Sequence, residues 1–431
     1  MKQSSRAPDA RPLSSLAQRF TAVRAATRAL AAPLTAEDCA IQSMPDASPV
    51  KWHLAHTTWF FETFVLERHD PRRTPFHPAF RVLFNSYYHG VGERHPRPRR
   101  GLLSRPSLAE VLDYRAAVEE EVVRLLERGD AGAPLQSLIE LGIQHEQQHE
   151  ELILTDVKHM LSCNPLKPAY QKNWPLTQVQ PRRGRWVHFA EGLEEIGHAG
   201  PGFSFDNERP RHRVFHEAFA LASQPVTHGD FLAFIEDGGY RKPELWLSAG
   251  WDAVVQRGWD APLYWEKIDG AWQTFTLHGM APVEEHTPIC HVSFYEADAF
   301  ARWAGARLPT EAEWEVAAAR LQVDGNFLES GALHPLALRE APAEGTLAQV
   351  YGDVWEWTRS DYAPYPGFET APGAVGEYNG KFMANQYVLR GGSCATPASH
   401  IRATYRNFFP ADARWQFSGV RLARDAGAAT A

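Results

Sequence analysis

Tryptophan and glycine are distributed unevenly along the chain, and this asymmetry narrows the range of possible folds most. Only 2 of the 14 tryptophans and 6 of the 31 glycines occur before residue 170. The first part instead shows long apolar segments with helical periodicity, whereas the rest has the short apolar runs and turn residues of strands. The sequence therefore predicts an α+β multidomain protein, with a helical domain followed by a mixed one. Its 431 residues suffice for two substantial cores.

Four helices are predicted in the first part. They cover residues 13–32, 48–66, 107–128 and 135–160. Ser48 and Pro49 are expected to be the N-cap and the first helical residue of the second helix. Ser107 and Glu110 have the spacing of a capping box at the start of the third. Four helices of this length predict a four-helix bundle.

The predicted domain limits follow from composition. A stretch with four prolines and little periodicity separates the helical part from the mixed part. The tail after Asp425 consists of small residues and is expected to fray. We predict a bundle at 1–165, a linker at 166–185, a second domain at 186–425 and a tail at 426–431.

Charge and hydropathy exclude several classes of protein. The chain has 44 Lys and Arg against 52 Asp and Glu, so nucleic acid and anionic membranes are not expected partners. No run approaches the roughly 18 to 20 apolar residues of a membrane span, and no secretory signal is recognisable, so a cytoplasmic location is expected. The four cysteines form no C-x-x-C pair, which argues against a disulfide framework or a zinc ribbon.

The fourth predicted helix carries His145 and His149. An i, i+4 pair lies on one helix face, so the two imidazoles can chelate one metal ion. Two histidines on a solvated face are the alternative. A third ligand would come from His53 or His56 on the second helix, if the bundle brings the two helices together.

The same histidines match the H-E-x-x-H pattern of zinc proteases. Metzincins need glycine and histidine seven and ten residues after the first histidine, and this chain has Leu152 and Thr155 there. No Asp or Glu occurs between Asp156 and Glu191 to supply a downstream carboxylate ligand. A zinc hydrolase is therefore a remote alternative.

The connection between the second and third helices, about residues 69–106, is long enough to be functional. Its aromatic residues argue against disorder. A basic cluster follows them, formed by Arg94, Arg97, Arg99 and Arg100. This cluster is either a carboxylate-binding site or a solvated arginine run.

At this point the chain resembles a known family. Segments 48–62, 83–88 and 145–149 are similar to the DinB-like domain of the EgtB-type sulfoxide synthases of ergothioneine biosynthesis. Segments 307–314, 352–357 and 390–393 resemble the formylglycine-generating-enzyme (sulfatase-modifying-factor) domain fused to it, which has a C-type-lectin-like fold. The second likeness alone would be weak, because that fold serves several functions, non-catalytic binding among them.

The resemblance implies a mononuclear non-haem iron(II) held by His56, His145 and His149. His56 is preferred over His53 because family members can lack a histidine at the latter position. The implied reaction uses O2 to join the sulfur of cysteine or γ-glutamylcysteine to C2 of the imidazole of hercynine, giving a sulfoxide. Gln148 is the residue on the fourth helix that would hold hercynine.

Further site residues follow from the same likeness. Asn407 likewise matches a family residue that holds hercynine, and Phe408 and Phe409 beside it are candidates for binding substrate. Arg97 and Arg100 are substrate-binding candidates from the basic cluster, as a carboxylate site. Tyr87 and Tyr88 match a tyrosine pair that one branch of the family places near the iron, whereas other members supply a catalytic tyrosine from the second domain. The pair could instead simply anchor the loop.

Two relatives of this chemistry are the nearest alternatives. A selenoneine synthase would use a seleno-sugar in place of the thiol. An ovothiol-type synthase would join sulfur to histidine itself and usually carries an additional methyltransferase domain.

Overall fold

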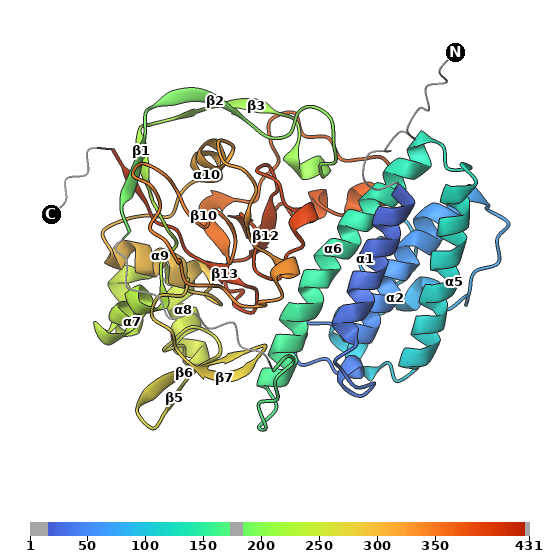
Figure 1. Cartoon of the computed structure of the whole chain (residues 1–431), viewed down its shortest axis with the longest axis horizontal. Helices are drawn as coiled ribbons and strands as arrows, with labels where there is room; N and C mark the ends of the chain where they lie inside the picture. Colours follow the sequence, from blue (N-terminus) through green and yellow to red (C-terminus); the bar gives the residue numbers. More distant parts are fainter. Residues whose placement is uncertain (1–15, 173–183, 427–431) are drawn as a thin grey trace, which may run out of the picture.

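The computed structural model describes residues 16–172 and 184–426. A helical unit and a mixed unit lie side by side, with the long helix α6 along their boundary (Figure 1). Residues 13–15 of the first predicted helix, 173–183 of the predicted linker and 427–431 of the predicted tail lie outside the described residues. No helix within the described ranges is long and apolar enough to cross a membrane.

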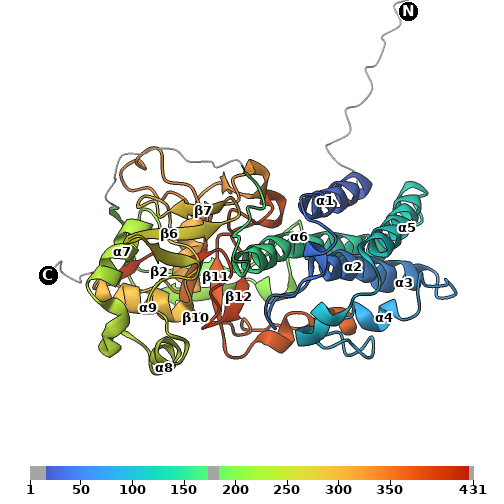
Figure 2. The ribbon, with the colours of Figure 1, turned by 90° about the horizontal axis from the view of Figure 1, so that it is seen from below.

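The predicted four-helix bundle is confirmed. Its helices are α1 (Leu16–Ala31), α2 (Val50–Phe61), α5 (Leu108–Glu127) and α6 (Ala133–Ser162). Helices α1 and α2 both pack on α6, and α5 packs on α2 and α1. Two short helices, α3 (Glu67–His69) and α4 (Phe80–Leu83), lie in the long connection on the outer side of the bundle (Figure 2).

The predicted start of α2 is wrong by one residue. Its N-cap is Pro49, and no side chain caps the helix. The backbone N–H of Ser48 donates to Asp156 Oδ2 at 2.8 Å, and Ser48 Oγ accepts from Arg100 Nη1 at 2.8 Å. These buried partners use the polar atoms that would otherwise cap the helix. At its far end α2 continues as the π-helical turn Glu62–Leu66.

The other predicted cap is present, and a second capping box occurs in the mixed unit. Ser107 and Glu110 form the capping box of α5. In the second unit, Thr310 caps α10 in the same way with Glu313. At α10 the capping box forms even though Glu313 also pairs with Arg307, because the carboxylate accepts several hydrogen bonds at once.

The second unit combines helices with small sheets. Its helices are α7 (His228–Glu236), α8 (Ser248–Arg257), α9 (Phe294–Trp303) and α10 (Glu311–Ala318). Its strands are β1 (Trp186–Phe189), β2 (Gly192–Ile196), β3 (His212–His216), β4 (Phe219–Ala222), β5 (Trp265–Ile268), β6 (Ala271–Thr276), β7 (Gly279–Pro282), β8 (Gly325–Asn326), β9 (Tyr351–Gly352), β10 (Trp355–Asp361), β11 (Gln386–Arg390), β12 (Asn407–Pro410), β13 (Ser418–Gly419) and β14 (Ala423–Asp425). The expected α+β character is thus confirmed.

The largest sheet has the strand order β12-β11-β10-β13. Strand β12 is antiparallel to β11, and its residues lie close to α6 in both views (Figures 1 and 2). The other sheets have the orders β1-β4-β14, β5-β6-β7, β2-β3 and β8-β9. The β12 edge and the start of β10, where Trp355 bonds to Glu151 of α6, are therefore the parts of this sheet that face the helical unit (Figure 1).

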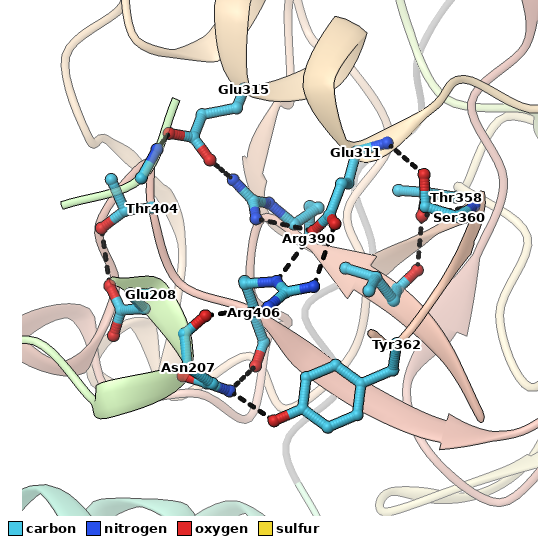
Figure 3. A network of polar contacts seen from close by, with 12 residues as sticks. Asn207, Glu208, Glu311, Glu315, Thr358, Ser360, Tyr362, Arg390, Thr404 and Arg406 are labelled. Atoms are coloured by element: carbon cyan, nitrogen blue, oxygen red, sulfur yellow. Dashed lines mark hydrogen bonds and ion pairs between the residues drawn. The ribbon is translucent and has the colours of Figure 1, made fainter. Parts of the chain in front are cut away.

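Buried ion pairs fix the residue that precedes β12. Arg406 makes a two-pronged ion pair with Glu311 of α10, at 2.9 and 3.0 Å (Figure 3). Arg390 of β11 pairs with Glu315 of the same helix. Charge-assisted bonds of this kind, with all partners buried, hold the backbone rigidly. Asn207 joins the network through Arg406 Nη1, which donates to its backbone oxygen at 2.8 Å.

The boundary between the units is polar as well as apolar. Glu151 of α6 accepts hydrogen bonds from Trp355 Nε1, Ser393 Oγ and Thr396 Oγ1 at 2.6 to 2.8 Å. The backbone N–H groups of residues 89 and 90 donate to the carboxylate of Glu377 at 2.9 and 2.7 Å. The segment around Glu377 thus crosses to the bundle and ties the second unit to the long connection (Figure 2).

Candidate metal centre and active site

Three buried histidines converge at the core of the bundle. His56 of α2 and His145 and His149 of α6 place one ligand nitrogen each within 4.8 Å of one another. Their spacing follows from the i, i+4 relation on α6 and from the packing of α2 on that helix. Three nitrogens this close could hold one metal ion.

Hydrogen bonds indicate which nitrogen of His56 is free to bind a metal. Its Nδ1 lies 2.6 Å from the carbonyl oxygen of Phe84, which can only accept, so Nδ1 carries the hydrogen. In the neutral ring Nε2 is then a lone pair, and it faces His145 Nε2 at 3.2 Å. His145 Nδ1 has no partner among the described residues. Without a metal, Nε2–H of His145 can donate to this lone pair; the other tautomer of His145 would turn both Nε2 lone pairs toward one point.

His53 lies behind His149 and does not join the triad. Its Nε2 donates to Asp156 Oδ2 at 2.9 Å, so its Nδ1 accepts from His149 Nδ1 at 2.8 Å. This leaves His149 Nε2 as the free lone pair. The carboxylate–imidazole–imidazole chain is the kind of support that orients metal-bound histidines. The structure thus groups His56, and not His53, with the pair on α6.

Burial keeps all three imidazoles in the neutral, ligand form. It lowers the pKa of His145 to about 4, against a smaller opposing effect of Glu146. Burial and the neighbouring His145 lower the pKa of His56 and of His149 well below the ordinary value. Neutral imidazoles are the form that binds divalent metals at neutral pH.

Glu146, the residue that would be the general base of a zinc protease, points away from the triad. Its carboxylate accepts from Arg24 Nη1 at 3.0 Å, from Thr27 Oγ1 at 2.7 Å and from Arg115 Nη2. Burial would raise its pKa, but the charges of Arg115 and Arg24 outweigh it and lower the pKa to about 2. The side chain is occupied in the bundle core and has no access to a metal-bound water.

Gln148 connects the triad region to the second unit. Its Nε2 donates to Tyr405 Oη at 2.7 Å, and its Oε1 accepts from Tyr378 Oη at 2.6 Å. Tyr405 Oη also lies 3.0 Å from Nε2 of His400. The Tyr378 ring centroid is 6.1 Å from that of His145. The amide of Gln148 is therefore oriented by two phenols from the second unit.

Tyr378 is a site residue that the sequence did not single out. It lies between the 3₁₀ helices Ala374–Glu377 and Gly380–Phe382, in a segment without any recognised motif. Tyr87 packs on Tyr88 at 4.8 Å and on Tyr378 at 5.6 Å between ring centroids. Burial raises the pKa of all three phenols, so each remains protonated at neutral pH. The structure thus brings three protonated phenols together near His145.

Two cavities meet at Gln148 and Tyr378. The larger, about 1110 Å³, reaches His145, Phe60 and Tyr88 from between the two units. The smaller, about 190 Å³, lies between α6 and β12 and is lined by Tyr87, Arg97, Asn407, Phe408, Phe409 and Gln416, among others. Both also contact Gln148 and Tyr378. We call the second one the small cavity.

Of the predicted substrate residues, most meet at the small cavity. Asn407, Phe408 and Phe409 enter it from β12, where Phe408 stacks on Tyr362 at 3.9 Å. Arg97 reaches it from the long connection, while its Nη2 donates to the carbonyl oxygen of residue 46.

Arg100 behaves differently from its neighbours in the basic cluster. It is buried, and its guanidinium lies 3.3 Å from the ring centroid of Trp52. Trp52 in turn stacks on His56, with centroids 4.5 Å apart and planes at 12°. A solvated arginine run is therefore wrong for Arg100. Arg100 lies over the ring that stacks on His56 and is not among the residues that line the small cavity.

Comparison with known proteins supports the same architecture. The DinB superfamily model matches residues 19–153, and the sulfatase-modifying factor enzyme 1-like domain matches 175–341 and 332–426. A hercynine oxygenase of Mycolicibacterium thermoresistibile is 34% identical over 90% of this chain and 90% of its own length. That of Mycobacterium tuberculosis is 33% identical over 88% and 92%.

A more distant relative is ergothioneine biosynthesis protein 1 of Schizosaccharomyces pombe, which is 27% identical over 52% of this chain and 28% of its own length. The similarity to the bacterial proteins extends through both units and includes the helices that carry the histidine triad. The chain therefore belongs to the EgtB-type family, in which a DinB-like helical bundle is fused to a formylglycine-generating-enzyme-like domain.

Proposed function

We propose that this oxidoreductase is an iron(II)- and O2-dependent sulfoxide synthase acting on hercynine. The thiol partner is cysteine or γ-glutamylcysteine. The names of the relatives, hercynine oxygenase and ergothioneine biosynthesis protein, support the substrate and the pathway. The single observation that carries the proposal is the buried three-histidine cluster beside an interdomain cavity.

The residues present fit a resident iron(II). Three neutral imidazoles are suitable ligands for iron and leave three positions of an octahedron free for substrates. Nε2 of His56 and Nε2 of His145 lie 3.2 Å apart, so both could serve as ligands of one ion. When bound, the iron would supply the redox chemistry that activates O2 and would accept the donor sulfur as a ligand.

The overall reaction balances without an external reductant. Hercynine loses the hydrogen on C2, the thiol loses its S–H hydrogen, and a new C–S bond forms. One oxygen atom of O2 ends on sulfur, and the other leaves as water with the two hydrogens. The four electrons that reduce O2 thus come from the two substrates. This stoichiometry distinguishes the proposed function from a hydrolase, which consumes no O2.

The chain's own residues would orient the reactants and handle one proton. Gln148, fixed by Tyr378 and Tyr405, presents its amide to the cavities, where we propose that it contacts hercynine. Asn407, Phe408 and Phe409 would form the opposite wall, and Arg97 would attract a substrate carboxylate.

A phenol would deliver the proton at its hydroxyl oxygen. Tyr87 and Tyr88 are the predicted donors, and we add Tyr378 because it lines both cavities and bonds to Gln148. Without this proton, oxidation is expected to continue on sulfur and to give a sulfinate in place of the sulfoxide.

We also propose that the domain limits stand as predicted, at 1–165 and 186–425. Helix α6 ends at Ser162, and β1 begins at Trp186. The family models leave residues 154–174 unmatched, between the two domains. The proposed division thus places all three candidate ligands in the first domain.

The direct test is turnover by protein loaded anaerobically with Fe(II). Hercynine and cysteine are added with a known amount of O2, and products are measured by mass spectrometry alongside O2 uptake. We expect one sulfoxide per O2 consumed. Zinc-loaded protein is the matched control, since zinc has no redox chemistry. Iron-loaded protein without O2 uptake, or zinc-loaded protein that hydrolyses peptides, would contradict the proposal.

A further inference from the structure

Gln416 is a buried amide without a partner. It lies just before β13 (Ser418–Gly419) and is only 2% exposed. Neither its Nε2 nor its Oε1 has a hydrogen-bond partner within the described part of the chain. The side chain lines the small cavity. A buried amide left unpaired costs free energy, so such a group is expected to meet a ligand or water.

A second unpaired acceptor lines the same cavity. Asn207 is also 2% exposed, and its Nδ2 donates to Tyr362 Oη at 2.9 Å (Figure 3). The backbone oxygen of Arg406 accepts from the same Nδ2 at 3.4 Å, which fixes the orientation of the amide. Asn207 Oδ1 is left without a partner in the residues described. Gln416 Oε1 and Asn207 Oδ1 are therefore two amide oxygens without a described donor, on two residues that line the same small cavity.

The wall formed by α6 adds a carboxyl group. Glu151 lines the cavity and accepts three hydrogen bonds, all from neutral groups of the second domain. No lysine or arginine of the described ranges is paired with its carboxylate, whose two oxygens are held by Trp355, Ser393 and Thr396. Arg97 supplies the positive group at the exposed side of the same cavity. The lining thus complements a zwitterion, with acceptors inside and a guanidinium outside.

We propose that Gln416 and Asn207 bind the α-ammonium group of the amino-acid thiol donor. The inference rests on the proposed function and assigns one substrate to this part of the site. The trimethylammonium group of hercynine has no N–H and cannot donate to Gln416 Oε1 or Asn207 Oδ1, whereas a primary ammonium has three N–H donors. Charge also favours an ammonium beside Glu151.

The size of the cavity agrees with a single small amino acid. Its volume of about 190 Å³ is below the roughly 300 Å³ at which pockets for drug-sized ligands begin. In γ-glutamylcysteine the cysteine nitrogen is an uncharged amide with one N–H, which matches two acceptors and a carboxylate less well. Gln416 is therefore a residue that would favour free cysteine.

The test compares two thiols and three proteins. L-Cysteine and 3-mercaptopropionate, which lacks the ammonium, are titrated calorimetrically into anaerobic iron-loaded protein. Wild type is expected to bind 3-mercaptopropionate about 10- to 100-fold more weakly than cysteine, because bonds to charged groups are lost. In Gln416→Met, which keeps the volume but removes both polar atoms, the ratio should fall to a few-fold. In Gln416→Glu, which keeps an acceptor, the preference for cysteine should be retained.

Two controls make the outcome specific. The hercynine affinity of Gln416→Met should equal that of wild type, and its thermal unfolding should show that it folds. A wild type that binds both thiols equally, or a Gln416→Met variant that loses hercynine and cysteine alike, overturns the inference. These are binding measurements, so failure of wild type to make sulfoxide would refute the proposed function separately. If Gln416→Met does not fold, the ratio of the affinities for cysteine and 3-mercaptopropionate, measured in wild type and in Gln416→Glu, still tests the inference.

Discussion

Replacing Glu146 by glutamine tests whether the H-E-x-x-H glutamate is structural or catalytic. The carboxylate is fully buried between Arg24 and Arg115, which are themselves 1% and 2% exposed. Its pKa is about 2 in the folded protein against an ordinary 4.5. At about 1.36 kcal/mol per pKa unit, the ionised side chain stabilises the fold by about 3 kcal/mol at neutral pH.

An independent estimate gives a similar size. Removing one partner of a buried ion pair usually costs about 3 to 5 kcal/mol. Glu150, one turn further on, also bonds Thr27, and the charge of Glu146 together with burial raises its pKa. In the variant Glu150 can ionise and take over part of the pairing, so the lower end is expected. For a domain of this size, about 3 kcal/mol corresponds to a Tm lower by about 6 to 12 °C.

The pH dependence provides the sharper assay. Because the folded-state pKa is depressed, the stabilisation is fully present above about pH 4.5 and is lost as the pH falls towards 2. The difference between wild type and Glu146→Gln in urea unfolding, followed by circular dichroism at 222 nm, should therefore be about 3 kcal/mol at pH 7. It should shrink to about 1.4 kcal/mol at pH 3.

Glu140 on the same helix provides a matched control. Its pair with Arg19 is partly exposed, so Glu140→Gln should cost only about 0 to 1 kcal/mol. The Glu146→Gln variant, assayed at a temperature where it is folded, is expected to keep its metal and most of its turnover. A variant as stable as wild type, yet with turnover reduced about 10²- to 10⁴-fold, would refute the reasoning and restore the general-base role.

Three further predictions concern the metal, the phenols and the donor. Alanine in place of any one of the three triad histidines should abolish turnover and remove the iron, as measured by elemental analysis. His53→Ala should keep iron, with an affinity about 10- to 100-fold weaker. Triad variants that retain both iron and turnover would contradict this prediction. Replacing Tyr378, Tyr87 or Tyr88 singly by phenylalanine should lower the sulfoxide-to-sulfinate ratio for the true proton donor, as read by mass spectrometry, and unchanged ratios in all three would exclude a phenol. Cysteine should give a kcat/KM at least equal to that of γ-glutamylcysteine, since the apolar ring of Phe409 cannot pair with a second ammonium, and a strong preference for the dipeptide would show that another group pairs with it.

Helix positions and the paired ligands on α6 could be predicted because they depend on short-range rules. The capping box of Ser107 and the shared face of His145 and His149 follow from spacing alone. The Ser48 cap failed where a tertiary partner intervened, since Asp156 lies more than 100 residues away in sequence. Local preference is routinely overridden by such buried contacts.

The remaining site residues depend on how the two domains meet. Tyr378 lies in an irregular segment, and Gln416 lies in a loop before a two-residue strand. Neither position has periodicity or a motif. The bond from Tyr378 to Gln148, and the place of Gln416 in a cavity that α6 also lines, exist only where the two domains meet. Likewise, the distinction between His53 and His56 could not be derived from spacing, because both lie on the α2 face that meets α6.

Helix α6 contacts both domains, and each of its two faces contacts a different one. His145 and His149 face α2 within the first domain, whereas Gln148 and Glu151 make their hydrogen bonds to the second. A small separation of the domains would therefore open the cavities to solvent while leaving the three imidazoles where they are. Reactants and product could then exchange many times without release of the metal. One loading with iron would therefore serve many turnovers.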